Sequence, residues 1–237
     1  MTITMRGNWP GQLTLRRGWA KAMARPWNDD FPGVQLRLVR GNAEFVAACS
    51  TELAAEYGQV VSPPLPSTNQ KLWVEAGYKP WLYLDLFSRD LHERIDPPTA
   101  SIVTGETTDW DAAIAIDRLS FETTWRLGAT GLAESREATP RSSFLVTRVD
   151  DDVAGFTIVG VSGSVSYLQR VAVRPDVQGR GLGRSLVRAS LRWGQKHGAS
   201  TMLLNTQPDN SSATGLYLSE GFVRLSSGLD VLKFEAS

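Results

Sequence analysis

The chain has 237 residues, and its 25 lysines and arginines equal its 25 aspartates and glutamates. This balance excludes the broad basic field with which proteins bind nucleic acid or anionic membrane surfaces. Hydrophobic residues at 42% and charged residues at 21% are typical of a globular protein that can bury a large core. We therefore expect neither a nucleic acid nor a membrane among its partners.

Cysteine usage and the first residues indicate where the protein works. Cys49 is the single cysteine, so no intramolecular disulfide can form. Its apolar, helical surroundings favour a buried structural thiol over a nucleophile. Residues 1–7 lack the apolar core of a secretory signal, and no apolar run approaches the length of a membrane span. These features predict a cytoplasmic protein.

The first part of the chain is expected to form a small α/β region. A strand-like segment at 34–39 precedes Asn42, which is placed to cap a helix over 43–57. A second strong strand pattern lies at 81–87.

A weak internal repeat links the two ends of the chain. Residues 72–78 resemble residues 216–222, because both segments are helix ends that turn at a glycine before an aromatic residue and a strand. The first copy has no glycine-rich turn before it and carries Trp73 where the second has Tyr217. The first copy is therefore not expected to bind a cofactor, and a chance similarity of two helix–glycine–strand units is the alternative.

Asp96-Pro97-Pro98 predicts a linker, so the chain is expected to divide into regions 1–98 and 99–237.

The acidic triplet 150–152 is expected to be a solvated hairpin turn rather than a metal site. Helices and strands alternate through the second region; they are a strand at 101–103, a helix at 110–121 with Asp109 as its cap, a loop with a short helix over 122–141, strands at 143–149, 153–161 and 167–173, a long helix to about 197, a strand at 201–205, a helix at 211–219 and a closing strand at 229–235.

A glycine-rich turn, Gln178-Gly179-Arg180-Gly181-Leu182-Gly183, joins the strand at 167–173 to the long helix. Such a turn leaves backbone N–H groups aimed outward at the positive end of a helix dipole, which makes a seat for phosphate. The Walker pattern is excluded because no Gly-Lys-Ser/Thr closes the turn. The dinucleotide fingerprint is excluded because the spacing is Gly-x-Gly-x-Gly.

Two motifs together resemble those of the GNAT acetyltransferase superfamily. The glycine-rich turn is similar to the family signature Q/R-x-x-G-x-G/A. Asn205 at a strand end, followed by residues 210–222, is similar to the family pattern of an asparagine and then N-x-x-A-x-x-L-Y-x-x-x-G-F. One helix and one strand separate the motifs, as the family fold requires. The chain is therefore identified as a member of this superfamily over about residues 99–237, preceded by a degenerate half-domain.

The resemblance implies an α/β fold with a mixed, mostly antiparallel central sheet flanked by helices, after a smaller α/β half-domain. It implies an N-acetyltransferase that uses acetyl-CoA, needs no metal and acts by direct attack in a ternary complex. The acceptor is expected to be the primary amine of a small molecule, a protein N-terminus or a lysine, and the enzyme a monomer or homodimer. The alternatives are a CoA-binding or regulatory protein without catalysis and a nucleotide-binding regulator.

The resemblance also implies how acetyl-CoA is held. The strands before and after the long helix splay apart, and the pantetheine arm pairs with backbone groups in the gap. Side chains of Arg174, Arg180 and Arg184 are expected to add charge for the phosphates. The residues expected to bind the cofactor are Val171, Ala172, Val173, Gln178, Gly179, Arg180, Gly181, Leu182, Gly183, Arg184, Asn205, Asn210, Ala213 and Tyr217.

Catalysis needs a stabilised carbonyl oxygen and a protonated leaving group. A strand N–H near Val171 is the expected oxyanion donor. Tyr217 matches the family tyrosine that faces the sulfur and protonates the departing thiolate, and a core tyrosine is the alternative.

The general base is left open, because no Asp or Glu occurs between Asp152 and Asp176. By strand parity, Tyr167 and Gln169 are expected to share a face with Val171, where a water held by them relays the proton.

Asp117 or Glu122 is the alternative base. Phe121 and Trp125, in a segment that resembles the acceptor side of the family, are expected walls of the acceptor pocket, with core packing as the alternative.

Overall fold

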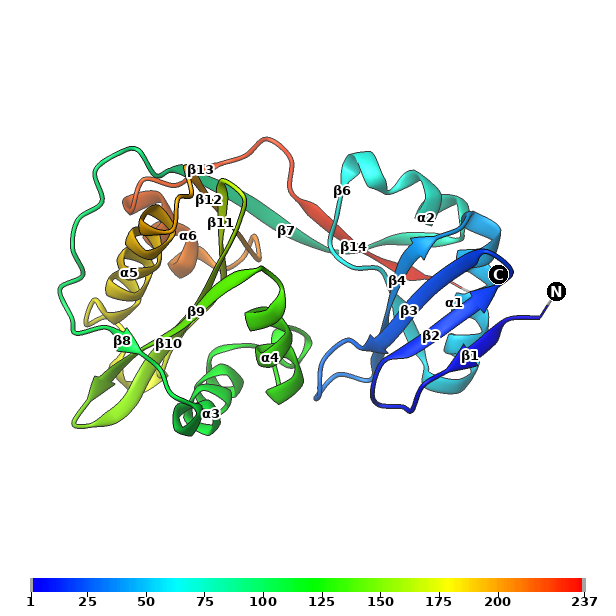
Figure 1. Ribbon diagram of the computed structural model, residues 1–237, viewed down its shortest axis with the longest axis horizontal. Coiled ribbons are helices and arrows are strands. Elements are labelled where there is room, and N and C mark those ends of the chain that lie inside the picture. The colour runs from blue at the N-terminus through cyan, green and yellow to red at the C-terminus, as the bar shows by residue number, and fades with distance from the viewer. Residues whose placement is uncertain (1, 236–237) are drawn as a thin grey trace. The chain divides into compact units, whose positions relative to one another are not determined.

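The computed structural model describes residues 2–235, and the chain folds into two compact units. Unit 1 comprises Met1–Asp85 and Ser226–Ser237, and unit 2 comprises Leu86–Leu225. Figure 1 labels most of the helices and strands of both units. Among the helices that the structure describes, none combines the length and the apolar character needed to cross a membrane.

Unit 1 is built on one sheet. Its neighbouring strands are, in order, β1 (Thr4–Arg6), β2 (Leu13–Arg17), β3 (Ala20–Pro26), β4 (Gly33–Arg40), β5 (Gln59–Val61), β14 (Leu229–Phe234) and the first part of β7 (Tyr78–Asp90), with the short β6 (Leu65–Pro66) beside β14. Its helical elements are α1 (Ala43–Tyr57), the short 3₁₀ helix η1 (Ser67–Asn69) and α2 (Lys71–Glu75).

The helix expected over 43–57 is confirmed as α1. The side chain of Asn42 accepts a hydrogen bond from the N–H of Phe45 at 3.0 Å, which satisfies one of the donors that a first helical turn leaves unpaired. Gly58 ends the helix with a φ of 88°, a value that glycine adopts without steric cost. Phe45, Cys49 and Leu53 bury one side of α1 in the core of unit 1.

Unit 2 is also built on one sheet, mixed and mostly antiparallel as expected. Its neighbouring strands are, in order, the last part of β7, β12 (Thr201–Thr206), β11 (Val165–Val173), β10 (Asp152–Ser162), β9 (Arg141–Val149) and β8 (Val103–Thr104), with β13 (Val223–Arg224) paired to β7. The helices are α3 (Trp110–Ser120), α4 (Ala129–Glu137), α5 (Leu182–Lys196) and α6 (Ser211–Ser219), with the 3₁₀ helices η2 (Thr107–Asp109), η3 (Thr123–Trp125) and η4 (Pro175–Val177).

Helices cover both faces of the sheet in unit 2. Successive residues of a strand point to opposite faces. On β9, Phe144 and Val146 pack with residues of α3 and α4, whereas Leu145 packs with residues of α5. Asp150 and Asp151 form the tight turn between β9 and β10 at positive φ, and Asp152 begins β10, so the acidic triplet lies at the hairpin that the sequence predicts.

The internal repeat is confirmed by the topology. In unit 1, β2, β3 and β4 pair antiparallel, α1 follows, and β5 pairs parallel to β4 over 33–35 and 59–61. In unit 2, β9, β10 and β11 pair antiparallel, α5 follows, and β12 pairs parallel to β11 over 165–167 and 201–203. A shorter helix, α2 or α6, comes next in each unit.

The two repeats differ where a phosphate would sit. The first turn of α1 is capped by the Asn42 side chain and carries Glu44. An occupied donor and a negative charge disfavour an anion at a helix N-terminus. Unit 1 therefore repeats the strand and helix order of unit 2 without the glycine-rich turn that is expected to hold a phosphate.

The division into compact units differs from the expected boundary at residue 98. Phe87, Leu91 and Ile95 lie in a hydrophobic core of unit 2, so the end of β7 and the residues after it belong there. The strand expected at 229–235 is present as β14, but it pairs with β5 and β7 in unit 1 instead of closing the sheet of unit 2. Unit 1 is therefore made of two separate segments of the sequence, and unit 2 is the continuous segment between them.

Asp109 occupies the position before α3, as the sequence predicts, but its side chain makes no capping hydrogen bond to that helix. Its carboxylate accepts a hydrogen bond from the N–H of Glu106 at 2.9 Å and pairs with Arg148 at 2.6 Å. Asp109 thus closes the turn before α3 and fastens it to β9.

Candidate active site

A gap opens between the central strands β11 and β12 of unit 2. The two strands pair in parallel only from Val165–Thr201 to Tyr167–Leu203. Beyond Tyr167, β11 continues to Val173 with its other edge bonded to β10. The edge of β11 that faces β12 is thus left without a strand partner over its second half. This divergence is the splay that the sequence resemblance implies.

A β-bulge lies on β11 at the start of the gap. Ile158 of β10 faces Arg170, but the next residue, Val159, faces Leu168. Gln169 is therefore an extra residue on β11, and a bulge of this kind leaves backbone groups without ladder partners. Such a group next to Val171 is a candidate hydrogen-bond donor for a ligand in the gap.

The bulge also reverses the alternation of side chains, so the expectation from strand parity is wrong. Leu168 and Val171 both pack in the cluster that includes α5, whereas Ala172 packs in the cluster that includes α3. The side-chain amide of Gln169 donates to Thr139 Oγ1 at 3.5 Å, close to α4. Gln169 therefore does not share the face of Val171, because parity counts only across an unbroken ladder.

The glycine-rich turn follows β11 after the short helix η4. Gly179 and Gly181 have φ values of 76° and 79°, which side chains with a Cβ rarely adopt. A Cβ added at either position would meet no atom within 4 Å, so the backbone conformation alone requires glycine there. Gly181 is the residue before α5, and the first N–H groups of that helix have no intrahelical acceptor. These groups make the candidate phosphate seat.

The side chains around this seat are mostly engaged with one another. Gln178 Nε2 donates to the carbonyl oxygen of Val173 at 2.9 Å, which ties the turn to the end of β11. Arg174 pairs with Asp176 at 2.7 Å, and Arg184 pairs with Glu220 at 3.1 Å. Arg180 is exposed. Of the three arginines expected to meet phosphate, two already have acidic partners.

Tyr217 lies on α6. That helix begins at Asn210, whose side chain accepts a hydrogen bond from the N–H of Ala213 at 3.1 Å. Tyr217 is 6% exposed and packs against the rings of Phe87 and Phe222, with centroid distances of 6.1 and 5.8 Å.

Burial raises the pKa of Tyr217 to about 12, and the charge of Arg170 acts in the opposite direction. The phenol is therefore protonated at neutral pH and is suited to donate a hydrogen bond. Asn205, also expected at the cofactor site, is exposed near the end of β12.

A buried ion pair organises the sequence between α3 and α4. Asp117 of α3 is fully buried and pairs with Arg170 of β11 at 2.6 Å. Arg170 also donates to the carbonyl oxygen of Trp125 at 2.7 Å, and its guanidinium lies 3.3 Å from the ring centroid of Phe121. The second oxygen of Asp117 accepts from the N–H of Leu127 at 2.6 Å. Phe121 and Trp125, the expected walls of the acceptor pocket, are thus brought together around Arg170.

These contacts separate the candidate bases. Both carboxylate oxygens of Asp117 are occupied and none of its surface is exposed, so its geometry is that of a structural anion. Glu122 is exposed and lies in the segment that Arg170 holds. Tyr167 is 36% exposed on β11. Glu122 and Tyr167 are therefore accessible to solvent, whereas Asp117 is not.

Arg170 and Glu220 are polar residues of the site that sequence reasoning missed. Arg170 is the charged residue of β11, and a charge in a central strand needs a partner. That signal could have indicated an ion pair. Among the residues that the structure describes, no cluster of three or more His, Cys, Asp or Glu side chains could hold a metal ion.

Comparisons with known proteins bear on what this site does. A family model described as the acetyltransferase (GNAT) family matches residues 110–222. The [ribosomal protein bS18]-alanine N-acetyltransferase of Escherichia coli K12 is 32% identical over 117 residues, which cover 49% of this chain and 76% of that protein.

Two further proteins resemble longer parts of the chain. The mycothiol acetyltransferase of Renibacterium salmoninarum is 28% identical over 141 residues, which are 54% of this chain. The match spans only 42% of that relative's length. A solved tandem GNAT protein from the clavulanic acid biosynthesis pathway superposes with a TM-score of 0.67 at 16% identity, over 95% of this chain and 82% of that one. This likeness supports the fold of both units.

Proposed function

Because the chain belongs to the acetyltransferase (GNAT) family of enzymes, we propose that it transfers an acetyl group from acetyl-CoA to a primary amine. The observation that carries the proposal is the open edge of β11, which leads through η4 into the glycine-rich turn. A strand edge and a phosphate seat in succession match a ligand that has amide groups at one end and a diphosphate in its middle.

The residues of the gap fit acetyl-CoA. Backbone groups of Val171 and the N–H of Val173 are assigned to the open edge of β11, where they can pair with the amides of a pantetheine arm. The carbonyl oxygen of Val173 already accepts from Gln178. The N–H groups at the start of α5 are available for a diphosphate, and no side chain of Gly179 or Gly181 blocks the approach. Acetyl-CoA supplies an acetyl thioester that an amine can attack directly in a ternary complex.

Two groups of the chain act on the thioester end. An N–H at the bulge next to Val171 holds the carbonyl oxygen as negative charge develops on it. Tyr217 donates its phenolic proton toward the sulfur. Its pKa of about 12 lies well above the ~8.5 of a thiol, so complete proton transfer is uphill. Tyr217 therefore acts chiefly through a hydrogen bond that strengthens as the thiolate forms.

The amine must lose a proton, and we assign this step to Glu122. Arg170 stacks on Phe121 and donates a hydrogen bond to the carbonyl oxygen of Trp125. These contacts hold the segment that carries Glu122 against β11, next to Val171 in the sequence of that strand. An exposed carboxylate there can take the proton directly or through water. Tyr167 is the alternative, as a group that positions the water.

We propose a primary amine as the acceptor, without choosing between a small molecule and a protein. Phe121 and Trp125 are proposed as apolar walls of its pocket. The names of two relatives give a ribosomal-protein alanine and mycothiol, a protein and a small molecule, so either acceptor class is open for this chain.

Two measurements on the purified protein test the proposal. Titration calorimetry with acetyl-CoA, using Gly181→Glu as the matched variant, should show binding that the bulk and negative charge at the phosphate seat abolish. Release of CoA should then depend on an added amine, assayed with a panel of small amines, lysine and N-terminal alanine peptides. Binding of acetyl-CoA without turnover on any amine would contradict catalysis and leave a CoA-binding protein. Absence of binding would contradict the site itself.

A separate comparison tests the base. Glu122→Gln should lower kcat with an amine acceptor, whereas Tyr167→Phe should leave kcat nearer to the wild-type value. The reverse pattern would assign proton removal to the water at Tyr167.

A further inference from the structure

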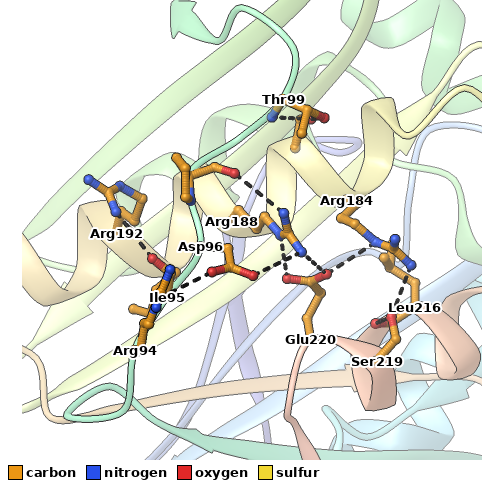
Figure 2. Close-up of polar contacts among 12 residues, drawn as sticks. Arg94, Ile95, Asp96, Thr99, Arg184, Arg188, Arg192, Leu216, Ser219 and Glu220 are labelled. Atoms are coloured by element: carbon orange, nitrogen blue, oxygen red, sulfur yellow. Dashed lines mark hydrogen bonds and ion pairs between the residues drawn. The ribbon is translucent and has the colours of Figure 1, made fainter.

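A cluster of charges joins the start of α5 to the end of α6 in unit 2. The Glu220 carboxylate accepts two hydrogen bonds from Arg188, at 2.7 Å from Nε and 3.0 Å from the terminal nitrogen. The same carboxylate pairs with Arg184 Nε at 3.1 Å. Figure 2 shows Arg184 and Arg188 approaching Glu220 from α5. One acid therefore serves two arginines one helical turn apart.

Arg188 is held from a second side as well. It pairs with Asp96 at 3.7 Å and donates to the carbonyl oxygen of Pro97 at 3.4 Å. Its side chain is 18% exposed. The neighbouring Arg192 and Ser185 fasten the same segment to α5 through Ile95 and Thr99 (Figure 2). Arg188 is thus fixed in place whether or not Arg184 stays beside it.

Arg184 is in a different position. Its side chain is 49% exposed, and beyond Glu220 it donates only to Ser219 Oγ, at 3.3 Å, among the contacts that the structure describes. It lies in the first turn of α5, directly after the glycine-rich turn. A cation in the first turn of a helix is opposed by the helix dipole unless an anion is nearby. Glu220 provides that anion here.

We propose that Glu220 shares Arg184 with the diphosphate of bound CoA, and that this competition sets the affinity for the cofactor. The proposal rests on the proposed function, since it requires the diphosphate to occupy the N-terminus of α5. With the seat empty, Arg184 pairs with Glu220. With a diphosphate at the seat, Arg184 turns to it, and Glu220 keeps both hydrogen bonds from Arg188.

The competition has a defined sign. Glu220 draws Arg184 away from the ligand, so it weakens the binding of CoA through its hold on that arginine. The effect applies equally to the product CoA, which carries the same diphosphate. Glu220 thus favours product release at the expense of tight binding.

A double-mutant cycle on the full-length protein tests the proposal. Glu220→Gln should tighten CoA binding, measured by titration calorimetry, by about 3- to 10-fold, because charge pairs at partly exposed sites couple modestly. Arg184→Met should weaken binding, and adding Glu220→Gln to it should restore little. Pantetheine, which lacks the diphosphate, should bind all four proteins alike in competition experiments.

Controls separate this effect from a general loosening of the fold. Asp96→Asn removes an acid that touches Arg188 but not Arg184, so it should leave CoA affinity unchanged. If Glu220→Gln fails to fold, as judged by circular dichroism and melting temperature, Glu220→Asp keeps the charge but is too short to reach both arginines, and should also tighten binding.

The outcomes are distinct. Weaker CoA binding by Glu220→Gln, or tightening that persists without Arg184, would overturn the proposal. A wild-type protein that binds CoA without turnover would contradict the proposed catalysis only. The double-mutant cycle would still test the competition for Arg184, because it measures CoA binding. A wild-type protein that does not bind CoA would overturn both.

Discussion

Tyr217 is a buried residue of the site whose hydroxyl group has a proposed role in catalysis. Tyr217 is packed between Phe87 and Phe222, and its phenol is the one part of that side chain with a chemical role in the proposal. Removing the hydroxyl keeps the ring and its packing. A Tyr217→Phe variant therefore isolates the hydrogen bond from the fold.

We expect Tyr217→Phe to lower kcat by about 10- to 100-fold, the usual range for loss of one acid–base group. The dissociation constant for acetyl-CoA should stay within error of the wild type, because the diphosphate is proposed to bind at the N-terminus of α5. Tyr57→Phe in unit 1 is the matched control. Unchanged kcat would place the proton donor elsewhere.

The buried phenol also makes the stability of the protein depend on alkaline pH. The pKa of Tyr217 is raised from 10.0 to about 12 by burial. The folded state thus holds its proton where the unfolded state has lost it. The protonated phenol contributes its full share to the free energy of unfolding below about pH 10. This contribution, roughly 2–3 kcal/mol in total, is lost as the pH rises to about 12.

Chemical unfolding followed between about pH 9 and pH 12 checks this slope. Tyr217→Phe should lose less stability with rising pH than the wild type does. Burial raises the pKa of Cys49 to about 12 and also raises that of Tyr78, so part of the slope should remain in the variant. A variant with the full wild-type slope would contradict the buried, protonated phenol.

For single residues, the sequence predicts which side chains belong to the site better than it predicts which side chains contact one another. Tyr217 and the glycines follow from motif spacing alone. Asp117 is an alternative base in the sequence, yet in the structure it is the buried partner of Arg170. The two residues are 53 positions apart, and no local pattern pairs them. Only the packing of α3 onto β11 shows that this carboxylate is occupied.

Elements of the site are well predicted where the pattern is local. The helices expected at 43–57 and 211–219 agree with α1 and α6. The bulge at Gln169 is different, because it depends on how β10 and β11 pair. Each strand alone reads as regular, so counting alternate residues from Val171 assigned Tyr167 and Gln169 to the wrong face.

The glycine-rich turn allows a prediction about two neighbouring positions. Gly181 has a φ of 79°, so Gly181→Ala should cost roughly 1–2 kcal/mol and displace the first N–H groups of α5. Gly183 has no positive φ, and an added Cβ would come no closer than 3.5 Å to Leu216. Gly183→Ala should therefore be tolerated in the fold, as the family signature with Gly or Ala at this position indicates.

Thermal unfolding and acetyl-CoA titration of the two variants provide the measurement. Gly181→Ala should lower both the melting temperature and the affinity, and Gly183→Ala should lower neither by a comparable amount. Equal effects of the two substitutions would show that backbone conformation is not what selects glycine at 181.

For the whole molecule, a cut at residue 98 does not separate the two units. A fragment of residues 99–237 would lose Phe87, Leu91 and Ile95 from the core of unit 2 and would keep β14 without β5 or β7. We expect it to be poorly folded, whereas a fragment of residues 86–225 should unfold cooperatively. Circular dichroism during heating distinguishes them. A cooperative transition in the fragment 99–237 would contradict this account.

The sequence predicts the fold of each repeat but not the path of the chain between units. Asp96-Pro97-Pro98 has the composition of a linker, and its position suited a boundary. In the structure the same segment is fixed along α5 by Arg188 and Arg192. The composition of a segment indicates its flexibility only in the absence of tertiary contacts. The arginines that bind this segment lie about 90 residues later in the sequence, so its composition does not reveal them.

The split of unit 1 across the chain also sets an order for folding on the ribosome. All of unit 2, residues 86–225, emerges before β14 does. Unit 1 leaves the ribosome first but lacks the strand that sits between β5 and β7, whose Val231 and Leu232 are fully buried. The first unit to be synthesised is therefore the last that can be completed, and until then it presents two open strand edges to the chaperones of the cell.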